Sequence, residues 1–193
     1  MERLLVLASS SPHRRALLDR LQLAYQVCSP DIDESRRPQE PAAEYVARLS
    51  LEKAQAVADR FPQALIIGSD QAAVLDDQIL GKPGTHERAL AQLKAAQGRA
   101  VQFLTGLTLF DAASGTAQTE VVPFTVYFRN LPEQALDRYL RLEQPYGCAG
   151  SFKSEGLGIV LFERLEGDDP TALIGLPLIR LTTMLARAGV QLP

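Results

Sequence analysis

Residues 4–23 read LLVLASSSPHRRALLDRLQL, and this stretch indicates the fold class. The apolar run Leu4–Ala8 predicts a short buried strand. Three serines and Pro12 follow it, and serine favours a helix cap while proline favours the first helical turn. A helical pattern then continues to about Leu23. The order strand, turn, helix is typical of mixed α/β folds.

The rest of the chain continues this alternation. Further strands are expected at 25–29, 65–68, 72–75, 78–80, 101–110, 119–128 and 157–162, and helices at 42–60, 85–97, 132–143 and 178–188. Asp76 and Asp77 are expected to form a two-residue hairpin turn, across which paired residue numbers would sum to 153. The polar segment 30–41 contains three prolines and is expected to be a surface loop. No repeat or long linker divides the chain, so residues 1–193 are expected to form a single domain.

Composition narrows the class of partner. The 193 residues carry 20 Lys and Arg against 23 Asp and Glu, a net charge of −3. A basic excess, which proteins that bind a nucleic-acid backbone usually show, is absent, so we expect a small-molecule partner and no nucleic-acid polymer. No apolar run approaches the roughly 20 residues of a membrane helix, which argues against a membrane partner and favours a cytoplasmic protein. Cys28 and Cys148 are then expected to be free thiols.

The serine turn Ser9–Ser11 combines hydroxyls, backbone N–H groups and the positive end of a helix dipole. This combination suits a phosphate, although the same residues also suit a plain helix cap. Arg14 lies three, four and seven residues before Leu17, Leu18 and Leu21, on their inward face. Its guanidinium could clamp a phosphate, or its stem could simply pass the edge of the core.

Lys53 interrupts an apolar stripe. Val46, Leu49, Lys53 and Val57 follow at helical spacing, so the ammonium lies on the buried face of its helix. A buried lysine needs an anionic partner or an opening to solvent. A structural ion pair and a role in ligand binding both satisfy that need.

Asp70 follows the apolar strand Leu65–Gly68. Ligands of α/β sheets bind beyond the carboxyl ends of strands, where a carboxylate can hold a metal ion or activate water; an Asp that begins a turn is the alternative. The hairpin register places Lys82 opposite Gln71, and a contact of Lys82 with Asp70 would need a bulge. The acidic segment Asp31–Glu34 could supply a second carboxylate for a hard divalent cation, or be only a solvated loop.

The polar loop Gly150–Gly156 carries one aromatic, one cation and one carboxylate between glycines. Phe152, Lys153 and Glu155 are residue types that can recognise a base, although Glu155 could instead pair with Lys153 at the rim of a site.

Taken in order, these segments resemble the Maf-like nucleoside triphosphate pyrophosphatase family. The matching pieces are Leu7–Arg15, Asp33-Glu34, Glu52-Lys53-Ala54, Gly68–Gln71, Gly81-Lys82-Pro83, Phe103–Gly106, Phe128-Arg129 and Ala149-Gly150. The resemblance spans essentially the whole chain. It implies a mixed α/β fold with an elongated twisted sheet flanked by helices, two lobes around a deep nucleotide-binding cleft, and commonly a homodimer. It also implies cleavage of a nucleoside triphosphate to monophosphate and pyrophosphate with Mg²⁺ or Mn²⁺.

The resemblance assigns roles by position. Asp70 matches the proton acceptor, and Glu34 with Asp70 would hold the metal. Arg14, Glu34, Lys53 and Lys82 match the family's charged cleft residues, whereas His13, Gln71 and Glu155 match positions tied to substrate choice. Ser9, Arg14, Lys53 and Lys82 are accordingly expected to bind the substrate. A nucleotide-binding regulator of cell division or septum formation without turnover is the alternative from another functional class.

The loop 148–156 looks like that of the branch that hydrolyses 7-methyl-GTP. It lacks the Ile-Gln-Gly ending of the branch that acts on dTTP and UTP, which stays the alternative substrate class. An ionised Glu155 could accept both donors on the Watson–Crick edge of a positively charged 7-methylguanine. Gln71 would add a hydrogen bond, and His13, which stands where this branch carries Trp, would stack on the base.

Overall fold

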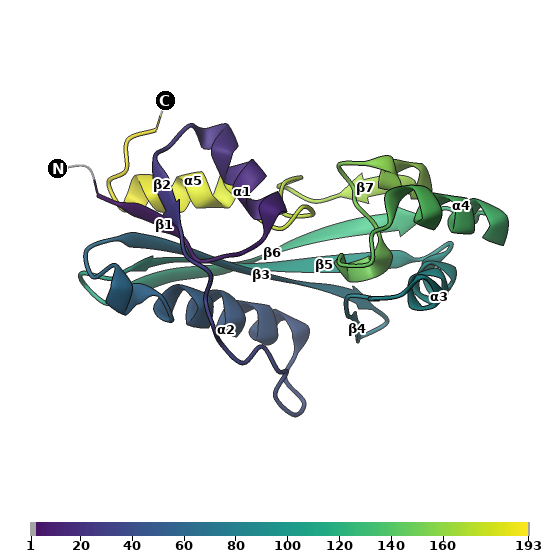
Figure 1. Ribbon diagram of the computed structural model, residues 1–193, viewed down its shortest axis with the longest axis horizontal. Coiled ribbons are helices and arrows are strands. Elements are labelled where there is room, and N and C mark those ends of the chain that lie inside the picture. Colours follow the sequence, from purple (N-terminus) through teal and green to yellow (C-terminus); the bar gives the residue numbers. More distant parts are fainter. Residues whose placement is uncertain (1–2, 193) are drawn as a thin grey trace. The chain divides into compact units, whose positions relative to one another are not determined.

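The computed structural model describes residues 3–192 (Figure 1). The strands are β1 (Leu5–Leu7), β2 (Tyr25–Val27), β3 (Leu65–Leu75), β4 (Gln78–Leu80), β5 (Ala100–Asp111), β6 (Thr116–Phe128) and β7 (Phe162–Glu166). The α-helices are α1 (Pro12–Leu18), α2 (Ala42–Gln55), α3 (His86–Ala96), α4 (Glu133–Glu143) and α5 (Leu178–Arg187). Short 3-10 helices are η1 (Asp19–Leu21), η2 (Ala58–Arg60), η3 (Ala149–Ser151) and η4 (Leu157–Leu161).

The fold is mixed α/β, as predicted. The seven strands form one sheet in the order β2-β1-β3-β5-β6-β7, and β4 pairs with β3. β1 pairs in parallel with β2 and β3, whereas the β3–β4 and β6–β7 pairs are antiparallel. The sheet is therefore mixed, with its parallel pairs near the N-terminus of the chain.

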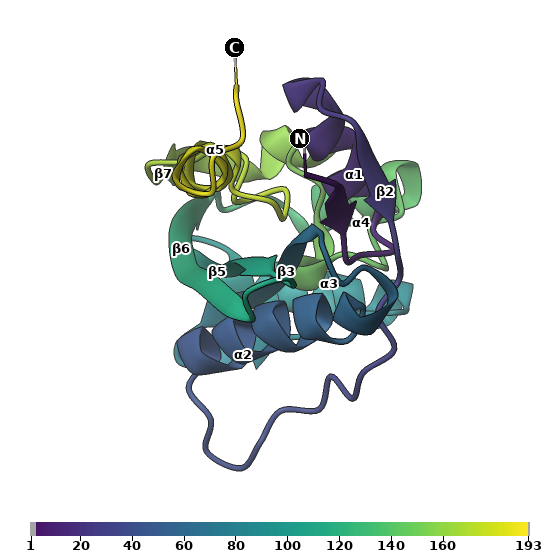
Figure 2. The ribbon, with the colours of Figure 1, turned by 90° about the vertical axis from the view of Figure 1, so that its left-hand side faces the viewer.

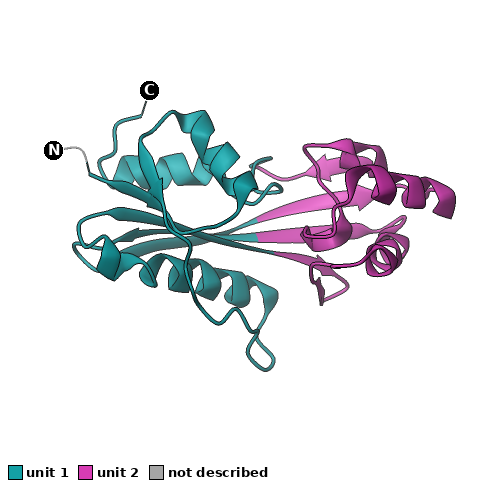
Figure 3. Ribbon diagram, in the orientation of Figure 1, with its two compact units in different colours: residues 1–71, 105–122, 169–193 teal, residues 72–104, 123–168 magenta. Residues whose placement is uncertain are grey.

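The chain divides into two compact units (Figure 3). Unit 1 comprises residues 1–71, 105–122 and 169–193, and unit 2 comprises residues 72–104 and 123–168. The long strands β3, β5 and β6 each begin in one unit and end in the other.

In unit 1, helices cover both faces of the sheet. Figures 1 and 2 show α2 on one face and α1 and α5 on the other. Because side chains of a strand alternate between faces, Leu65 and Ile67 of β3 join the apolar cluster with α1 and α5, whereas Ile66 joins the cluster with α2. The alternation continues through the polar residues Ser69, Asp70 and Gln71 in the middle of the strand, where it places Asp70 on the opposite face from Ser69 and Gln71.

Two glycines let α2 approach the sheet closely. A Cβ added at Gly68 of β3 would lie 2.0 Å from the backbone oxygen of Ser50, and one added at Gly106 of β5 would lie 2.1 Å from that of Val46. The Ser50 hydroxyl also lies 2.8 Å from the hydroxyl of Thr108 on β5. These contacts determine the distance between α2 and strands β3 and β5.

Unit 2 contains an aromatic cluster. The rings of Phe103, Phe128 and Phe162 surround Phe152 edge to face, with centroids 4.8–5.6 Å apart. Helices α3 and α4 are joined by His86, whose Nε2 lies 2.8 Å from Asp137 Oδ1. The aromatic cluster therefore anchors the loop 150–156 through Phe152.

The hairpin register is confirmed: Ala73, Val74 and Leu75 pair with Leu80, Ile79 and Gln78. Asp76 and Asp77 have φ of 45° and 63°, the left-handed values that a two-residue turn of this type needs. β4 ends at Leu80, so Lys82 lies outside the ladder and is exposed, and the expected pairing of Lys82 with Gln71 is wrong.

Two further expectations are wrong. β3 does not end at Gly68 but continues to Leu75, so Asp70 lies inside a strand rather than beyond it. Segment 157–161 forms the 3-10 helix η4, and the strand begins only at Phe162. A Cβ at Gly158 would lie 2.2 Å from the backbone oxygen of Lys153, so the tight turn that this glycine allows replaces extended chain.

Between residues 3 and 192, no helix has the length and apolar character needed to cross a membrane. Cys28 and Cys148 are both free thiols.

Candidate active site

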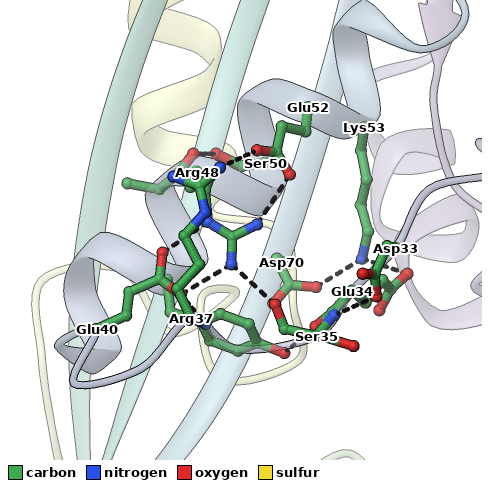
Figure 4. Close-up of polar contacts among 12 residues, drawn as sticks. Asp33, Glu34, Ser35, Arg37, Glu40, Arg48, Ser50, Glu52, Lys53 and Asp70 are labelled. Carbon is green, nitrogen blue, oxygen red and sulfur yellow. Dashed lines mark hydrogen bonds and ion pairs between the residues drawn. The ribbon is translucent and has the colours of Figure 1, made fainter.

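The centre of the candidate site is an ion pair between β3 and α2. Asp70 faces α2 because it shares the strand face of Ile66 and Gly68, and only 7% of the residue is exposed. Lys53 Nζ lies 2.6 Å from Asp70 Oδ1, and Lys53 is 6% exposed (Figure 4). The interrupted apolar stripe therefore predicted correctly that Lys53 is buried. Of the two ways to accommodate it, an anionic partner or an opening to solvent, the structure shows an anionic partner.

Glu34 brings a second carboxylate to the same ammonium. Its Oε1 lies 3.0 Å from Lys53 Nζ, and its side chain is 55% exposed. The Tyr45 hydroxyl of α2 donates a hydrogen bond to the backbone oxygen of Glu34 at 3.0 Å. Asp70 and Glu34 are thus held together by one lysine although 36 positions separate them in the sequence.

The loop that carries Glu34 is anchored by Arg48 of α2 (Figure 4). Arg48 Nε and Nη2 donate to the two carboxylate oxygens of Glu40 at 2.6 and 2.8 Å, and Nη1 donates to Glu52 Oε2 at 2.9 Å. Nη2 also donates to the backbone oxygen of Ser35 at 3.2 Å, next to Glu34. The hydrogen bond from Arg48 lowers the pKa of Glu40 to about 2. The arginine therefore fixes both ends of the segment 35–40.

The opposite face of β3 holds the loop 169–177. Ser69 Oγ donates to the backbone oxygen of Gly175 at 2.9 Å, and Gln71 Nε2 donates to that of Ala172 at 2.7 Å. Thr105 of β5 donates to the same oxygen of Ala172 at 2.9 Å. Ser69 and Gln71 thus bind one side of the strand to this loop while Asp70, between them, points to α2.

The N-terminus of α5 is capped by residues of that loop. Asp169 Oδ2 accepts from the backbone N of Ile179 at 2.8 Å, and Thr171 Oγ1 accepts from that of Leu178 at 2.8 Å. Thr171 Oγ1 in turn donates to Asp169 Oδ1 at 2.6 Å, and Asp169 is 1% exposed. These polar contacts of the loop therefore have a structural role, because they hold the loop to the N-terminus of α5.

The positive charge of Arg14 interacts with the negative charges of Asp70 and Glu34. Its Nε donates to the backbone oxygen of Gly175 at 2.8 Å. Burial lowers the pKa of Arg14, and the charges of Asp70 and Glu34 oppose that shift. Unit 1 thus assembles two cations and two anions that the sequence had singled out separately.

The serine turn has the hydrogen bonds of a helix cap. Ser9 Oγ accepts from the backbone N of Ser11 at 3.1 Å, and Ser11 Oγ accepts from that of Arg14 at 3.4 Å. Ser9 is 5% exposed, and His13 lies half-buried in the first turn of α1. In this structure the serines serve α1, and Ser10 at the apex is exposed.

Unit 2 carries the two remaining candidates. Glu155 is exposed and accepts from Ser154 Oγ at 3.3 Å. The neighbouring Lys153 Nζ lies 3.3 Å from Glu143 Oε1 of α4 and donates to the backbone oxygen of Glu143 at 3.1 Å. Lys82 is exposed in the segment between β4 and α3.

Sequence reasoning missed Arg48, Glu40 and Thr105. Arg48 and Glu52 stand four residues apart on one helix, a spacing that signals an ion pair. Nothing in the local sequence links Glu40 or Thr105 to their partners, because those contacts depend on how the loops return to the sheet.

The carboxylates suit a hard divalent cation. Between residues 3 and 192, no group of three or more His, Cys, Asp and Glu side chains is placed to hold a metal ion. Mg²⁺, however, is commonly held by one or two carboxylates together with substrate phosphates. Asp70 and Glu34, brought to one point by Lys53, fit that kind of site.

Comparison with known proteins identifies the family. The family model described as Maf-like protein matches residues 4–188. The chain belongs to this family. This Maf-like protein is 61% identical over 185 residues to a protein of Nitrosococcus oceani named 7-methyl-GTP pyrophosphatase, covering 96% of this chain and 93% of that one. A Pseudomonas aeruginosa protein of the same name is 59% identical over 189 residues, 98% of each chain.

A solved structure shares the fold of this Maf-like protein. The structure of a HAM1 protein from Coxiella burnetii matches 96% of this chain and 99% of its own, with a TM-score of 0.52 and 14% identity. At that identity the likeness concerns the fold alone.

Proposed function

We propose that this Maf-like protein is a nucleoside triphosphate pyrophosphatase that hydrolyses 7-methyl-GTP to 7-methyl-GMP and pyrophosphate. The names of the relatives support the substrate. The observation that carries the chemistry is the buried Lys53 between Asp70 and Glu34, with Arg14 in their field. Two cations and two carboxylates in one unit suit a polyanion that is bound and then cleaved by water.

In the proposed reaction, the oxygen of a water molecule forms a bond to the α-phosphorus. The bond from that phosphorus to the bridging oxygen breaks, and pyrophosphate leaves. Asp70 accepts the proton of the attacking water. Arg14 and Lys53 neutralise phosphate charge, and we assign Lys82 to the same task and the Ser9 hydroxyl to substrate binding. A divalent cation held by Asp70 and Glu34, Mg²⁺ or Mn²⁺, would stabilise the charge that develops on the phosphates.

The reaction is tested by measuring the products. Wild-type protein with Mg²⁺ or Mn²⁺ is expected to release pyrophosphate and 7-methyl-GMP, and EDTA to abolish the release. Asp70→Asn is expected to lower kcat by about 10²–10⁴-fold, the usual contribution of a general base. Asp59→Asn, on the exposed helix η2, is the control and is expected to match wild type.

Two outcomes would contradict the proposed reaction. Tight nucleotide binding without pyrophosphate release would favour a non-catalytic regulator of cell division. Stepwise release of orthophosphate would contradict attack at the α-phosphorus.

We assign base recognition to Glu155, Gln71 and His13. The carboxylate of Glu155 can accept the two parallel donors of guanine, and the positive charge of 7-methylguanine strengthens both bonds. The Gln71 Nε2 hydrogens already serve the loop 169–177, which leaves its amide oxygen for a substrate donor. His13 offers a ring face for stacking.

Glu155→Gln tests this assignment, because the amide N–H₂ of glutamine would face a donor of guanine and could not accept its hydrogen bond. The preference for 7-methyl-GTP over GTP, dTTP and UTP, measured as ratios of kcat/KM, is expected to fall by about 1–3 kcal/mol. Glu133→Gln, an exposed carboxylate of α4, is the matched control. A wild-type preference for dTTP or UTP would contradict the proposal that 7-methyl-GTP is the substrate, but it would not contradict the pyrophosphatase reaction.

We further propose that residues 1–193 act as a single Maf-like domain, in the cytoplasm and as a homodimer. The family resemblance supports the dimer, and the net charge of −3 supports a nucleotide rather than a nucleic-acid polymer as partner. We expect no membrane partner, because no apolar run of the sequence approaches the length of a membrane helix. Light scattering of the purified protein measures the oligomeric state.

A further inference from the structure

The Lys53 ammonium lies between the two carboxylates of the candidate site. Its Nζ lies 2.6 Å from Asp70 Oδ1 and 3.0 Å from Glu34 Oε1, the two carboxylates that we propose as metal ligands. The lysine is buried and lies on α2, which the close approach at Gly68 and Gly106 holds against the sheet. The carboxylate pair therefore has a cation supplied by the chain itself.

The charges of the four side chains balance. Asp70 and Glu34 carry two negative charges, and Lys53 and Arg14 carry two positive ones. A divalent cation would bring two more positive charges next to the ammonium, in a partly buried place where charge repulsion is strong. A triphosphate would reverse this balance, because its roughly four negative charges offer the ammonium another partner.

Lysine is suited to such an exchange. Its ammonium is a point charge on a flexible stem, whereas the fork of arginine is rigid. Arg48 shows the contrast on the same helix, because its fork is held by Glu40, Glu52 and Ser35 at once. Rotation about the bonds of a lysine side chain moves the charge without moving the helix that carries it.

We propose that Lys53 is a resident counter-cation that competes with the divalent metal for Asp70 and Glu34 until a triphosphate draws it away. The free protein then binds the metal weakly, and metal and nucleotide bind in a coupled manner. By linkage, the coupling acts equally in both directions. This inference rests on the proposed assignment of Asp70 and Glu34 as metal ligands.

The test is direct binding of Mn²⁺ to the full chain without nucleotide, by calorimetry or by electron paramagnetic resonance of the free ion. Lys53→Gln removes the charge and keeps N–H donors for the carboxylates. It is expected to bind Mn²⁺ about tenfold or more tightly than wild type. Lys53→Arg keeps the charge and is expected to bind as weakly as wild type.

Two controls locate the effect. Lys94→Gln removes the charge of an exposed lysine that also pairs with a carboxylate, Glu133, at 2.7 Å, and is expected to behave as wild type. Adding Asp70→Asn to Lys53→Gln is expected to remove the gain in affinity, because a proposed ligand is then lost.

Equal Mn²⁺ affinity of wild type and Lys53→Gln would overturn the inference. If Lys53→Gln does not fold, wild type alone decides: a dissociation constant in the low micromolar range would overturn the inference, and one of hundreds of micromolar would support it. Pyrophosphate release from 7-methyl-GTP is measured separately on wild type. Its absence would contradict the proposed function, whereas the binding comparison addresses only the competition by Lys53.

Discussion

Glu40 shows how one side chain places the functional loop. Its carboxylate accepts both Arg48 bonds and the backbone N of Arg37 at 3.0 Å, and it is 8% exposed. Because Arg48 also reaches the backbone of Ser35, the pair holds the chain next to Glu34. A residue without contact to Lys53 thus helps to decide where a proposed metal ligand lies.

The Glu40–Arg48 pair gives a pH-dependent stability. The pKa of Glu40 is about 2 in the folded protein and about 4.3 in an unfolded chain. Between these values the unfolded state binds the proton and the folded state does not, so the stabilisation is present above about pH 4.3 and is lost as the pH falls to about 2. We expect Glu40→Gln to lower the free energy of unfolding at pH 7 and to differ progressively less from wild type below pH 4.3, as measured by urea denaturation.

Glu44→Gln is the control for this measurement, since Glu44 is an exposed carboxylate in the first turn of α2. Its free energy of unfolding is expected to stay close to that of wild type at every pH. If the free energy of unfolding of Glu40→Gln stayed below that of wild type by the same amount down to pH 2.5, the role given to the carboxylate charge would be contradicted.

At the scale of elements, the packing of α2 on the sheet sets the distance between Lys53 and Asp70. A side chain at Gly106 would meet the backbone of Val46, which cannot rotate away, so the helix itself would have to move. We expect Gly106→Ala to lower the free energy of unfolding by about 1–3 kcal/mol, the usual effect of overpacking, and to reduce pyrophosphate release as well. Urea denaturation and kcat/KM measure the two effects.

Gly147→Ala is the matched control, because a Cβ at Gly147 meets nothing within 4 Å. Its stability is expected to stay within about 0.5 kcal/mol of wild type, as for most surface changes. If Gly106→Ala were equally mild, the close approach of α2 would not be what holds the ion pair.

Two features of the sequence were sufficient to predict local structure correctly. The Asp76-Asp77 turn determined its hairpin register, because a two-residue turn leaves only one pairing. The burial of Lys53 followed from helical spacing alone. The position of Asp70 within a strand did not follow from the sequence: the Gly-Ser-Asp run is typical of a turn, yet each of these residues meets a partner that the fold brings to its own face of β3.

At the scale of the whole molecule, β3, β5 and β6 carry the backbone from one unit to the other three times. If the part of such a strand in one unit unfolds, it loses hydrogen bonds to the neighbouring strands. Those hydrogen bonds also help to order the part of the strand in the other unit. Continuous strands therefore favour one cooperative transition, which is how a single domain over residues 1–193 would behave.

The cysteines provide one reporter in each unit. Cys28 is buried in unit 1, and Cys148 is half-buried in unit 2, where burial raises the pKa of its thiol. We expect pulse labelling with a thiol reagent, read by mass spectrometry along a urea gradient, to expose both cysteines with the same midpoint and to count two thiols in the denatured chain. The buried Cys28 is expected to be protected in the absence of urea. Two separate midpoints would mean that the units unfold independently despite their shared strands, and a mass two hydrogens lower would mean that the thiols pair.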